Sequence, residues 1–464
     1  MLSLMGFLTV GAILVLLLTN RVAAVVALAG VPVVTGLVAG FAPAEIGEFV
    51  ESGIGDVAGV TAMFVFAIVY FGVMRDAGMF DPVIERIVGF AGSAPATVCV
   101  ATTALAAAAH LDGAGATTFL ITIPAMLPVF DRLGMRRLVL ATCVGLGAGV
   151  MNLLPWGGPT ARAATTTGVP VNDLWVPLIP AQVAGIVAAL AIAWFLGRRE
   201  SRRIGHPVAA RDGVAVGAGG DGTVPTGGAG VPGGAAGPPA AGADGPADAA
   251  EEELRRPRLL WFNVVLTGAV VAGLVAAVAP PELLFLAAVV VALVVNYPGL
   301  KRQTARIEAH ARGAMLMATT LLAAGVFLGI LEGTGMIEAM ARSAAALVPG
   351  GAAPALPVLA GLVAVPLSLL FGPDAYYFGV LPVLIGVGEQ FGVSGVAIAQ
   401  ASLLGEETVG FPISPLTGSF FLLVGLSGVE IGRHIRHLLG WAWLTGVVML
   451  AVALATGAVP LWAA

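Results

Sequence analysis

The sequence predicts an all-α membrane protein made of two inverted repeats, each with five membrane crossings, a re-entrant hairpin and a broken helix. Three observations predict this fold class. Apolar stretches of about 20 residues, the length that spans a bilayer core, recur along nearly the whole chain. Polar strings rich in Gly and Pro interrupt these stretches at two places in each half, and the two halves resemble each other in sequence.

The composition excludes a soluble enzyme. Hydrophobic residues make up 58% of the chain and charged residues only 11%, whereas soluble proteins carry about 25% charged residues. The net charge of −5 lies in loops, so a lipid bilayer is expected as a partner and a nucleic acid is not. Cys99 and Cys143 fall inside apolar stretches and predict neither a disulfide nor a metal site, and no cofactor is expected.

Apolar stretches between breakers give five crossings in the first repeat, residues 1–197, and five in the second, residues 259–464. The first 21 residues lack a basic start and a cleavage site, so they are interpreted as a retained span and not as a signal peptide. The predicted crossings are 3–19, 22–41, 59–75, 137–168 and 177–197, followed by 259–279, 282–298, 313–331, 395–427 and 437–459.

One further pair of apolar arms lies between the third and fourth crossing of each half. The two pairs cover 94–130 and 355–388, and each pair meets at a tip rich in Gly, Pro and Asp. Because these tips are polar but have almost no loop, each pair is interpreted as a re-entrant hairpin. The fourth crossings, 137–168 and 395–427, contain Gly and Pro at their centres and are interpreted as broken helices.

Loop charges indicate the orientation. If the hairpins do not cross the membrane, Arg and Lys gather in alternate loops, as they do in cytoplasmic loops. One set of alternate loops holds nearly all the basic residues: Arg21; Arg75 and Arg86; Arg132, Arg136 and Arg137; those within 198–258; Lys301, Arg302, Arg306 and Arg312; and Arg433 with Arg436. We therefore expect a multi-pass protein of the plasma membrane, with both termini outside and a cytoplasmic linker at 198–258. The Gly, Ala and Pro in the centre of this linker predict disorder.

The two halves match at a nearly constant offset. FGVMRDAGMFD at 71–81 matches LGILEGTGMIE at 328–338, and PAMLPVFDRLGM at 124–135 matches PVLIGVGEQFGV at 382–393. PWGGPTARAATTTGV at 155–169 matches PLTGSFFLLVGLSGV at 415–429. Because each half crosses five times, the copies must be inverted, which is typical of secondary transporters with a site near the membrane midplane.

Polar residues inside the bilayer mark the candidate site, because they are costly there and usually functional. They lie at the hairpin tips and the helix breaks, where opened backbone can bind ions. The candidate substrate-binding residues are Asp112, Thr117, Thr118, Asn152, Thr160, Arg162, Asp374, Tyr376, Ser414 and Thr417. The candidate proton-coupling residues are Asp112, Asp374, Glu406 and Glu407.

Each charged candidate has a structural alternative. Asp112 and Asp374 could bind a cation or a proton, or could cap a half-helix. Arg162 could pair with a substrate carboxylate or extend to the interface. Neighbours on a helix face different directions, so at most one of Glu406 and Glu407 is expected to point into the site.

The neutral candidates are less decisive. His110 could relay protons or be a hydrogen-bonded structural residue. Tyr376 and Tyr377 could equally pack the second hairpin.

At these residues the chain resembles the citrate–metal:proton symporter family. The strings that carry the resemblance are YFGVMRDAGMFDP at 70–82, LDGAGATTFLITIPAMLP at 111–128, GVMNLLPWGGPTAR at 149–162, DAYYFGVLPVL at 374–384, ASLLG at 401–405 and SPLTGSFFLLVGLSGVE at 414–430. More distantly, the pattern is similar to the ion transporter superfamily.

The resemblance implies proton-coupled uptake of citrate bound to a divalent metal, which arrives with the citrate. Citrate with three negative charges would call for more cationic groups than this core holds, whereas the metal complex carries one negative charge. Inverted repeats around one site further predict an elevator mechanism, and a homodimer is an open alternative to a monomer.

Two alternatives stay open. The first is a sodium-coupled di- or tricarboxylate transporter of the same superfamily, because Na⁺ also binds Thr, Asn and carbonyl oxygens. The second is a channel or a membrane-embedded enzyme. No HExxH, GxSxG or Walker-type motif accompanies the buried acids, so the sequence does not favour an enzyme.

Overall fold

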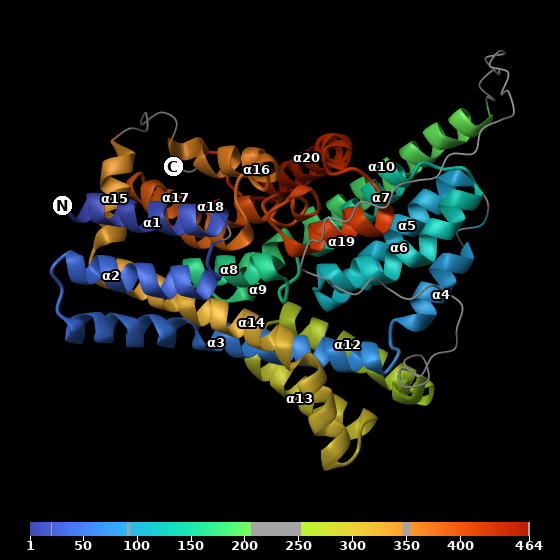
Figure 1. Cartoon of the computed structure of the whole chain (residues 1–464), viewed down its shortest axis with the longest axis horizontal. Coiled ribbons are helices and arrows are strands. Elements are labelled where there is room, and N and C mark those ends of the chain that lie inside the picture. Colours follow the sequence, from blue (N-terminus) through green and yellow to red (C-terminus); the bar gives the residue numbers. More distant parts are fainter. Residues whose placement is uncertain (20, 91, 93, 206–251, 347–352, 463–464) are drawn as a thin grey trace, which may run out of the picture.

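The computed structural model describes all residues except 20, 91, 93, 206–251, 347–352 and 463–464 (Figure 1). Within the described residues every regular element is helical. The centre of the predicted linker falls in 206–251 and so lies outside the described residues. Figure 1 shows the chain ends N and C at the same end of the long axis.

The first repeat begins with three helical segments that lead into a long helix, and the two hairpin arms and the broken helix follow. Its elements are α1 (Leu2–Leu18), η1 (Val26–Gly30), α2 (Val31–Val38), α3 (Pro43–Asp76), α4 (Asp81–Phe90), α5 (Pro95–Ala109), η2 (His110–Asp112), α6 (Gly115–Arg132), α7 (Arg137–Met151), α8 (Gly158–Thr167), α9 (Val171–Trp175), η3 (Val176–Leu178) and α10 (Ile179–Gly205).

The second repeat has the same order of long helix, hairpin and broken helix. Its elements are η4 (Pro257–Leu259), α12 (Leu260–Val275), α13 (Pro281–Asn296), α14 (Leu300–Gly333), α15 (Met336–Ala345), η5 (Ala353–Ala355), α16 (Leu356–Leu367), η6 (Ala375–Val380), α17 (Leu381–Gln390), α18 (Gly395–Leu403), η7 (Phe411–Ile413), α19 (Gly418–Ser427) and α20 (Ile431–Thr456).

The long helices α3 and α14 pack side by side and run antiparallel (Figure 1). Gly53 of α3 lies against Gly329 of α14, and Gly72 of α3 lies against His310 of α14. At the offset of the first matched string, 53 corresponds to 310 and 72 to 329, so a two-fold rotation exchanges the two contacts. The absence of side chains at these glycines lets the two backbones approach closely. The repeats are therefore inverted in space as well as similar in sequence.

Four helices differ from the hydropathy pattern. The predicted third crossings, 59–75 and 313–331, are the apolar ends of α3 and α14, which begin at Pro43 and Leu300. Hydropathy missed their first turns because these carry the loop acids and bases. The short helices α4 and α15 were not predicted either, and they pack on α5 and α17 respectively.

The interrupted elements position the site. The arms α5 and α6 meet at His110–Ala114. The arms α16 and α17 are joined by residues 368–374, followed by η6, which leads into α17. The chain between α7 and α8 is broken at 152–157, and that between α18 and α19 at 404–417, where only η7 is helical. Figure 1 shows α5 and α6 toward one end of the long axis and α16 and α17 toward the other.

Candidate functional site

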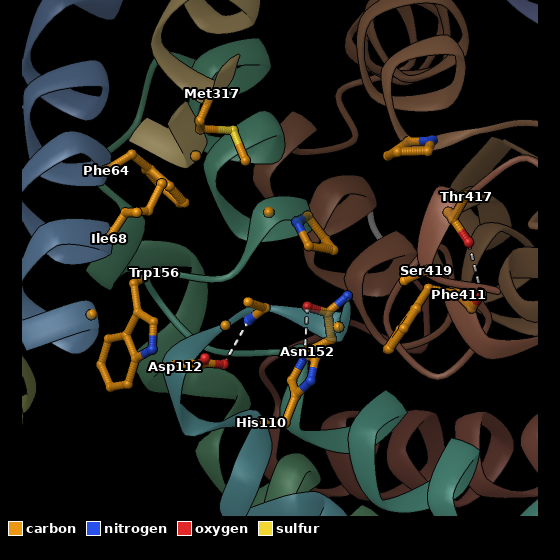
Figure 2. A pocket seen from close by; sticks show the side chains of 18 of the residues that line it. Phe64, Ile68, His110, Asp112, Asn152, Trp156, Met317, Phe411, Thr417 and Ser419 are labelled. Carbon is orange, nitrogen blue, oxygen red and sulfur yellow. Dashed lines mark hydrogen bonds between the residues drawn. The ribbon is translucent and has the colours of Figure 1, made fainter. Parts of the chain in front are cut away.

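Both breaks and both hairpin tips contribute to one cavity of about 460 Å³ beside α3 and α14. Figure 2 shows Asp112 and His110 of the first tip near Asn152 of the first break, with Phe411 and Thr417 of the second break and Ser419 of α19 across from them. Pro373 of the second tip also lines the cavity. The remaining lining residues come from α3, from α14 and from the rest of these segments: Phe64, Ile68, Gly72, Arg75, Gly113, Ala114, Gly115, Trp156, Gly158, Pro159, Arg162, Ala309, His310, Gly313, Met317 and Glu407.

An ion pair joins the first tip to α3. Arg75 Nη1 lies 3.2 Å from Asp112 Oδ2 and donates a 3.0 Å hydrogen bond to Thr117 Oγ1. The other carboxylate oxygen, Asp112 Oδ1, accepts a 2.9 Å hydrogen bond from the backbone N–H of Ala114. Gly113 makes this turn possible with a left-handed backbone at φ 74°. The tip thus presents a carboxylate that is 6% exposed and already paired.

A buried chain of hydrogen bonds ties the first tip to both breaks. His110 Nδ1 lies 2.8 Å from Thr118 Oγ1, and His110 Nε2 lies 3.1 Å from Asn152 Oδ1. Asn152 Nδ2 donates a 2.6 Å hydrogen bond to the backbone carbonyl of Glu407. Because both ends of its amide are engaged by protein, Asn152 fixes the two breaks relative to each other.

The second break holds two adjacent acids with different surroundings. Glu407 lines the cavity and has a backbone φ of 52°, which is unusual for a residue other than glycine. Its side chain is buried, and Oε1 has no hydrogen-bond partner among the described residues. Glu406 does not line the cavity, and its Oε2 accepts a 3.2 Å hydrogen bond from Ser368 Oγ. The strained backbone at Glu407 therefore separates the directions of the two carboxylates.

A second ion pair joins the first break to the second tip. Arg162 Nε donates a 2.7 Å hydrogen bond to Asp374 Oδ1, and Arg162 Nη1 donates to the carbonyl of Gly158 at 3.1 Å. Arg162 lines the main cavity, and Asp374 lines an adjoining hollow of about 280 Å³. Pro373 lines both spaces, so the two are neighbours.

The structure brings together some predicted site residues and separates others. Five of them line the cavity directly: Asp112, Asn152, Arg162, Glu407 and Thr417. Three contact lining residues: Thr117 contacts Arg75, Thr118 contacts His110, and Asp374 contacts Arg162.

The other four predicted residues lie outside the cavity lining: Thr160, Tyr376, Glu406 and Ser414. All four are buried. The Tyr376 hydroxyl bonds Ser402 Oγ at 2.8 Å, and the hydroxyls of Thr160 and Ser414 have no partner among the described residues.

Several lining residues were not predicted from the sequence, among them Arg75, Trp156 and His310. Arg75 was grouped with the loop charges, although it precedes the end of α3 by one residue, and His310 was not singled out. Trp156 stacks on Phe71 with ring centroids 4.7 Å apart and donates to the carbonyl of Leu111 at 2.8 Å. Arg75 and Phe71 belong to the string that the two halves share, and Trp156 belongs to the string at the first break. That repetition was the available signal.

The charges of the cavity are nearly balanced. Arg75 and Arg162 each pair with a carboxylate, and Glu407 adds a negative charge when it is ionised. Asp112 and Glu407 are the lining carboxylates that could contact a cation. Across the described parts of the chain, no three His, Cys, Asp or Glu residues gather as a metal site would require.

The chain is similar to known citrate transporters over nearly its whole length. A family model described as "Citrate transporter" matches residues 8–405. A "Citrate transporter" of Bacillus subtilis (strain 168) is 40% identical over 457 residues, which is 98% of this chain and 99% of that protein. The "Mg(2+)/citrate complex secondary transporter" of the same organism is 38% identical and covers 99% of both chains.

A solved structure shares the fold. The Alcanivorax borkumensis YdaH transporter aligns with a TM-score of 0.54 and 16% sequence identity, covering 89% of each chain. At this identity the likeness shows the fold alone. It confirms the predicted all-α fold class. Five described helices are long and apolar enough to cross a membrane.

Proposed function

Because the chain belongs to the citrate transporter family, we propose that it imports citrate as a complex with a divalent metal ion, coupled to protons. Its named relatives are transporters and not enzymes, and one of them is named for the Mg²⁺–citrate complex. The membership and the apolar helices place the protein in a membrane.

The observation that carries the metal complex is the pairing of both cavity arginines. Arg75 pairs with Asp112, and Arg162 pairs with Asp374. Neither guanidinium brings an uncompensated positive charge to meet the three negative charges of free citrate. Burying the negative charge of free citrate without compensation is costly in a low-dielectric site. A divalent metal reduces the charge of the bound citrate to one, which this cavity can accept.

Glu407 is the residue best suited to carry the proton. The aspartates of the site are paired with arginines, whereas Glu407 Oε1 has no partner among the described residues. A buried carboxyl without a cationic partner is more stable when protonated. Glu406 remains the second candidate, and sodium coupling remains the alternative mechanism.

Uptake of radiolabelled citrate into proteoliposomes tests this function. We expect uptake to need a divalent metal, to fall to background in EDTA, and to collapse with a protonophore. Replacing Na⁺ by K⁺ should leave uptake unchanged. Equal uptake in EDTA would remove the metal from the mechanism, and a strict need for Na⁺ would favour the sodium-coupled alternative.

The mechanism we assign is an elevator. Residues 94–169 and 355–428 contain both hairpins and both broken helices, and they would slide as one block against the remaining spans. The inverted repeats support this assignment, because each repeat can adopt the conformation of the other in the opposite state.

A cysteine cross-link tests the sliding. Leu14 of α1 lies 3.0 Å from where a Cβ on Gly379 of η6 would be, which joins the outer spans to the block. In a protein without Cys99 and Cys143, cross-linked Leu14→Cys/Gly379→Cys should turn over at least about tenfold more slowly while citrate binding persists.

A matched pair provides the control for that cross-link. The carboxylate of Glu282 of α13 lies 3.6 Å from where a Cβ on Gly59 of α3 would be, and both residues belong to the outer spans. The cross-linked Gly59→Cys/Glu282→Cys protein should keep the turnover of its reduced form. If the Leu14–Gly379 cross-link also left turnover unchanged, the block does not slide past α1.

The orientation and the oligomeric state stay predictions. Labelling of a cysteine introduced at Gly230 from one side of the membrane tests whether the linker is cytoplasmic. The expected states are a monomer or a homodimer. The mass of the purified protein in detergent tests that state.

A further inference from the structure

We propose that the ion pair between Arg75 and Asp112 is the specificity filter of the site, which selects a ligand that carries both charges at once. Arg75 would bind a citrate carboxylate, and Asp112 would bind the metal that accompanies it. The proposal rests on the proposed function and adds Arg75 to the substrate-binding residues.

Arg75 is only partly committed to the protein. Among the described residues, its side-chain hydrogen bonds use Nη1 alone, which contacts both Asp112 and Thr117. The guanidinium has five N–H donors in a planar fork, so Nε and Nη2 keep their capacity for a two-pronged carboxylate contact. The side chain is 36% exposed and lines the cavity. A carboxylate can therefore reach it without first unfolding the tip.

Asp112 is held independently of Arg75. The backbone N–H of Ala114 donates to Oδ1, whereas Oδ2 is the atom that faces Arg75. When a ligand carboxylate binds Nε and Nη2, it shares the single positive charge of Arg75, so the Asp112 carboxylate stays in place without full charge compensation. Asp112 is buried, because its side chain is only 6% exposed. An unpaired buried carboxylate needs a replacement cation.

Arg75 and Asp112 together distinguish free citrate, a free metal ion and the complex of the two. Free citrate would take Arg75 but leave Asp112 unpaired, and a free metal ion would take Asp112 but leave Arg75 unpaired. Only a carboxylate bound to a metal replaces both partners in one event. The ion pair therefore disfavours each component alone and accepts their complex.

Neighbouring ion pairs do not share these properties. Asp76, the residue after Arg75, accepts from both Arg306 Nη1 at 3.0 Å and His310 Nε2 at 2.8 Å, and Arg306 does not line the cavity. Arg162 uses Nε on Asp374 and Nη1 on Gly158. Asp374 also lies in the adjoining hollow. Arg75 and Asp112 are the pair whose two members both line the main cavity.

The test measures binding of radiolabelled citrate to the purified protein, in Mg²⁺ or in EDTA. Asp112→Asn frees Arg75, so we expect citrate affinity in EDTA to rise at least about tenfold over the unmodified protein. The double variant Arg75→Gln/Asp112→Asn should lose this gain, because the gain depends on Arg75. A gain of binding also shows that the variant is folded.

Two variants separate pair exchange from a general change of charge. Glu407→Gln removes a negative charge from the same cavity without freeing an arginine, and Asp131→Asn breaks the exposed pair with Arg137. Asp131→Asn should leave metal-free citrate binding unchanged, and Glu407→Gln should raise it less than Asp112→Asn does. If Asp112→Asn gives no gain, or if Glu407→Gln gives an equal one, the proposal is wrong. If the unmodified protein binds citrate equally well in EDTA, the proposed function itself fails.

Discussion

Replacing Arg162 with Ala lowers citrate uptake at least about a hundredfold, because leaving a buried charge without its partner costs roughly 3–5 kcal/mol. Arg162 holds Asp374 at 2.7 Å and the Gly158 carbonyl at 3.1 Å, so it joins the first break to the second tip. Arg162→Lys should fail to restore uptake, since one ammonium group cannot reproduce the planar guanidinium that contacts both the Asp374 carboxylate and the Gly158 carbonyl.

Uptake into proteoliposomes at equal protein amounts measures this loss. Arg342→Lys is the matched control, because Arg342 also holds a carboxylate, that of Glu338 at 2.8 Å, but is 60% exposed. It should transport like the unmodified protein. Normal uptake by both Arg162 variants would mean that the second tip needs no arginine, and the substrate contacts would have to be sought at Arg75 and Glu407.

Replacing Glu407 with Gln uncouples transport from protons. The amide matches the shape of a protonated carboxyl but cannot release a proton. We expect the proton gradient to drive no accumulation of citrate, so uptake stops at the level set by the citrate gradient alone. Exchange of internal for external citrate should continue, since exchange does not require the site to lose its proton.

Comparison of accumulation with exchange measures this effect. Glu338→Gln removes an acid that is 64% exposed and should accumulate citrate normally. Glu406→Gln tests the alternative assignment, because Glu406 is buried beside Ser368 and does not line the cavity. If accumulation is lost in Glu406→Gln and kept in Glu407→Gln, the proton residue is Glu406.

Much of the fold could be predicted because the bilayer restricts what apolar and polar strings can form. Both breaks lie within the predicted ranges, and the hairpin arms α6 and α17 end two residues beyond theirs, at Arg132 and Gln390. Gly and Pro at these points are the residues that open a helix. The start of α14 at Leu300 could not be located from hydropathy, because its first turns carry Lys301 and Arg302, which also fit a loop.

The site could be predicted only in part, because partner choice depends on the fold. Asp112 and Arg162 stood out as charges in apolar surroundings, but the pairing of Arg162 with Asp374 joins residues 212 positions apart. Arg75 was missed because it was assigned to a cytoplasmic loop when the basic residues were used to predict the orientation. Helix geometry led us to expect at most one of Glu406 and Glu407 in the site, but which of them lines the cavity depends on a positive φ at Glu407 that no sequence pattern indicates.

Uptake of citrate and metal measured together tests the central claim most directly. Proteoliposomes receive radiolabelled citrate and a radiolabelled divalent metal ion at once, and both labels are counted in the same vesicles. The account predicts that the two accumulate in equal amounts, and that omission of either stops entry of the other. Accumulation of citrate without metal, or of metal without citrate, would contradict transport of the complex.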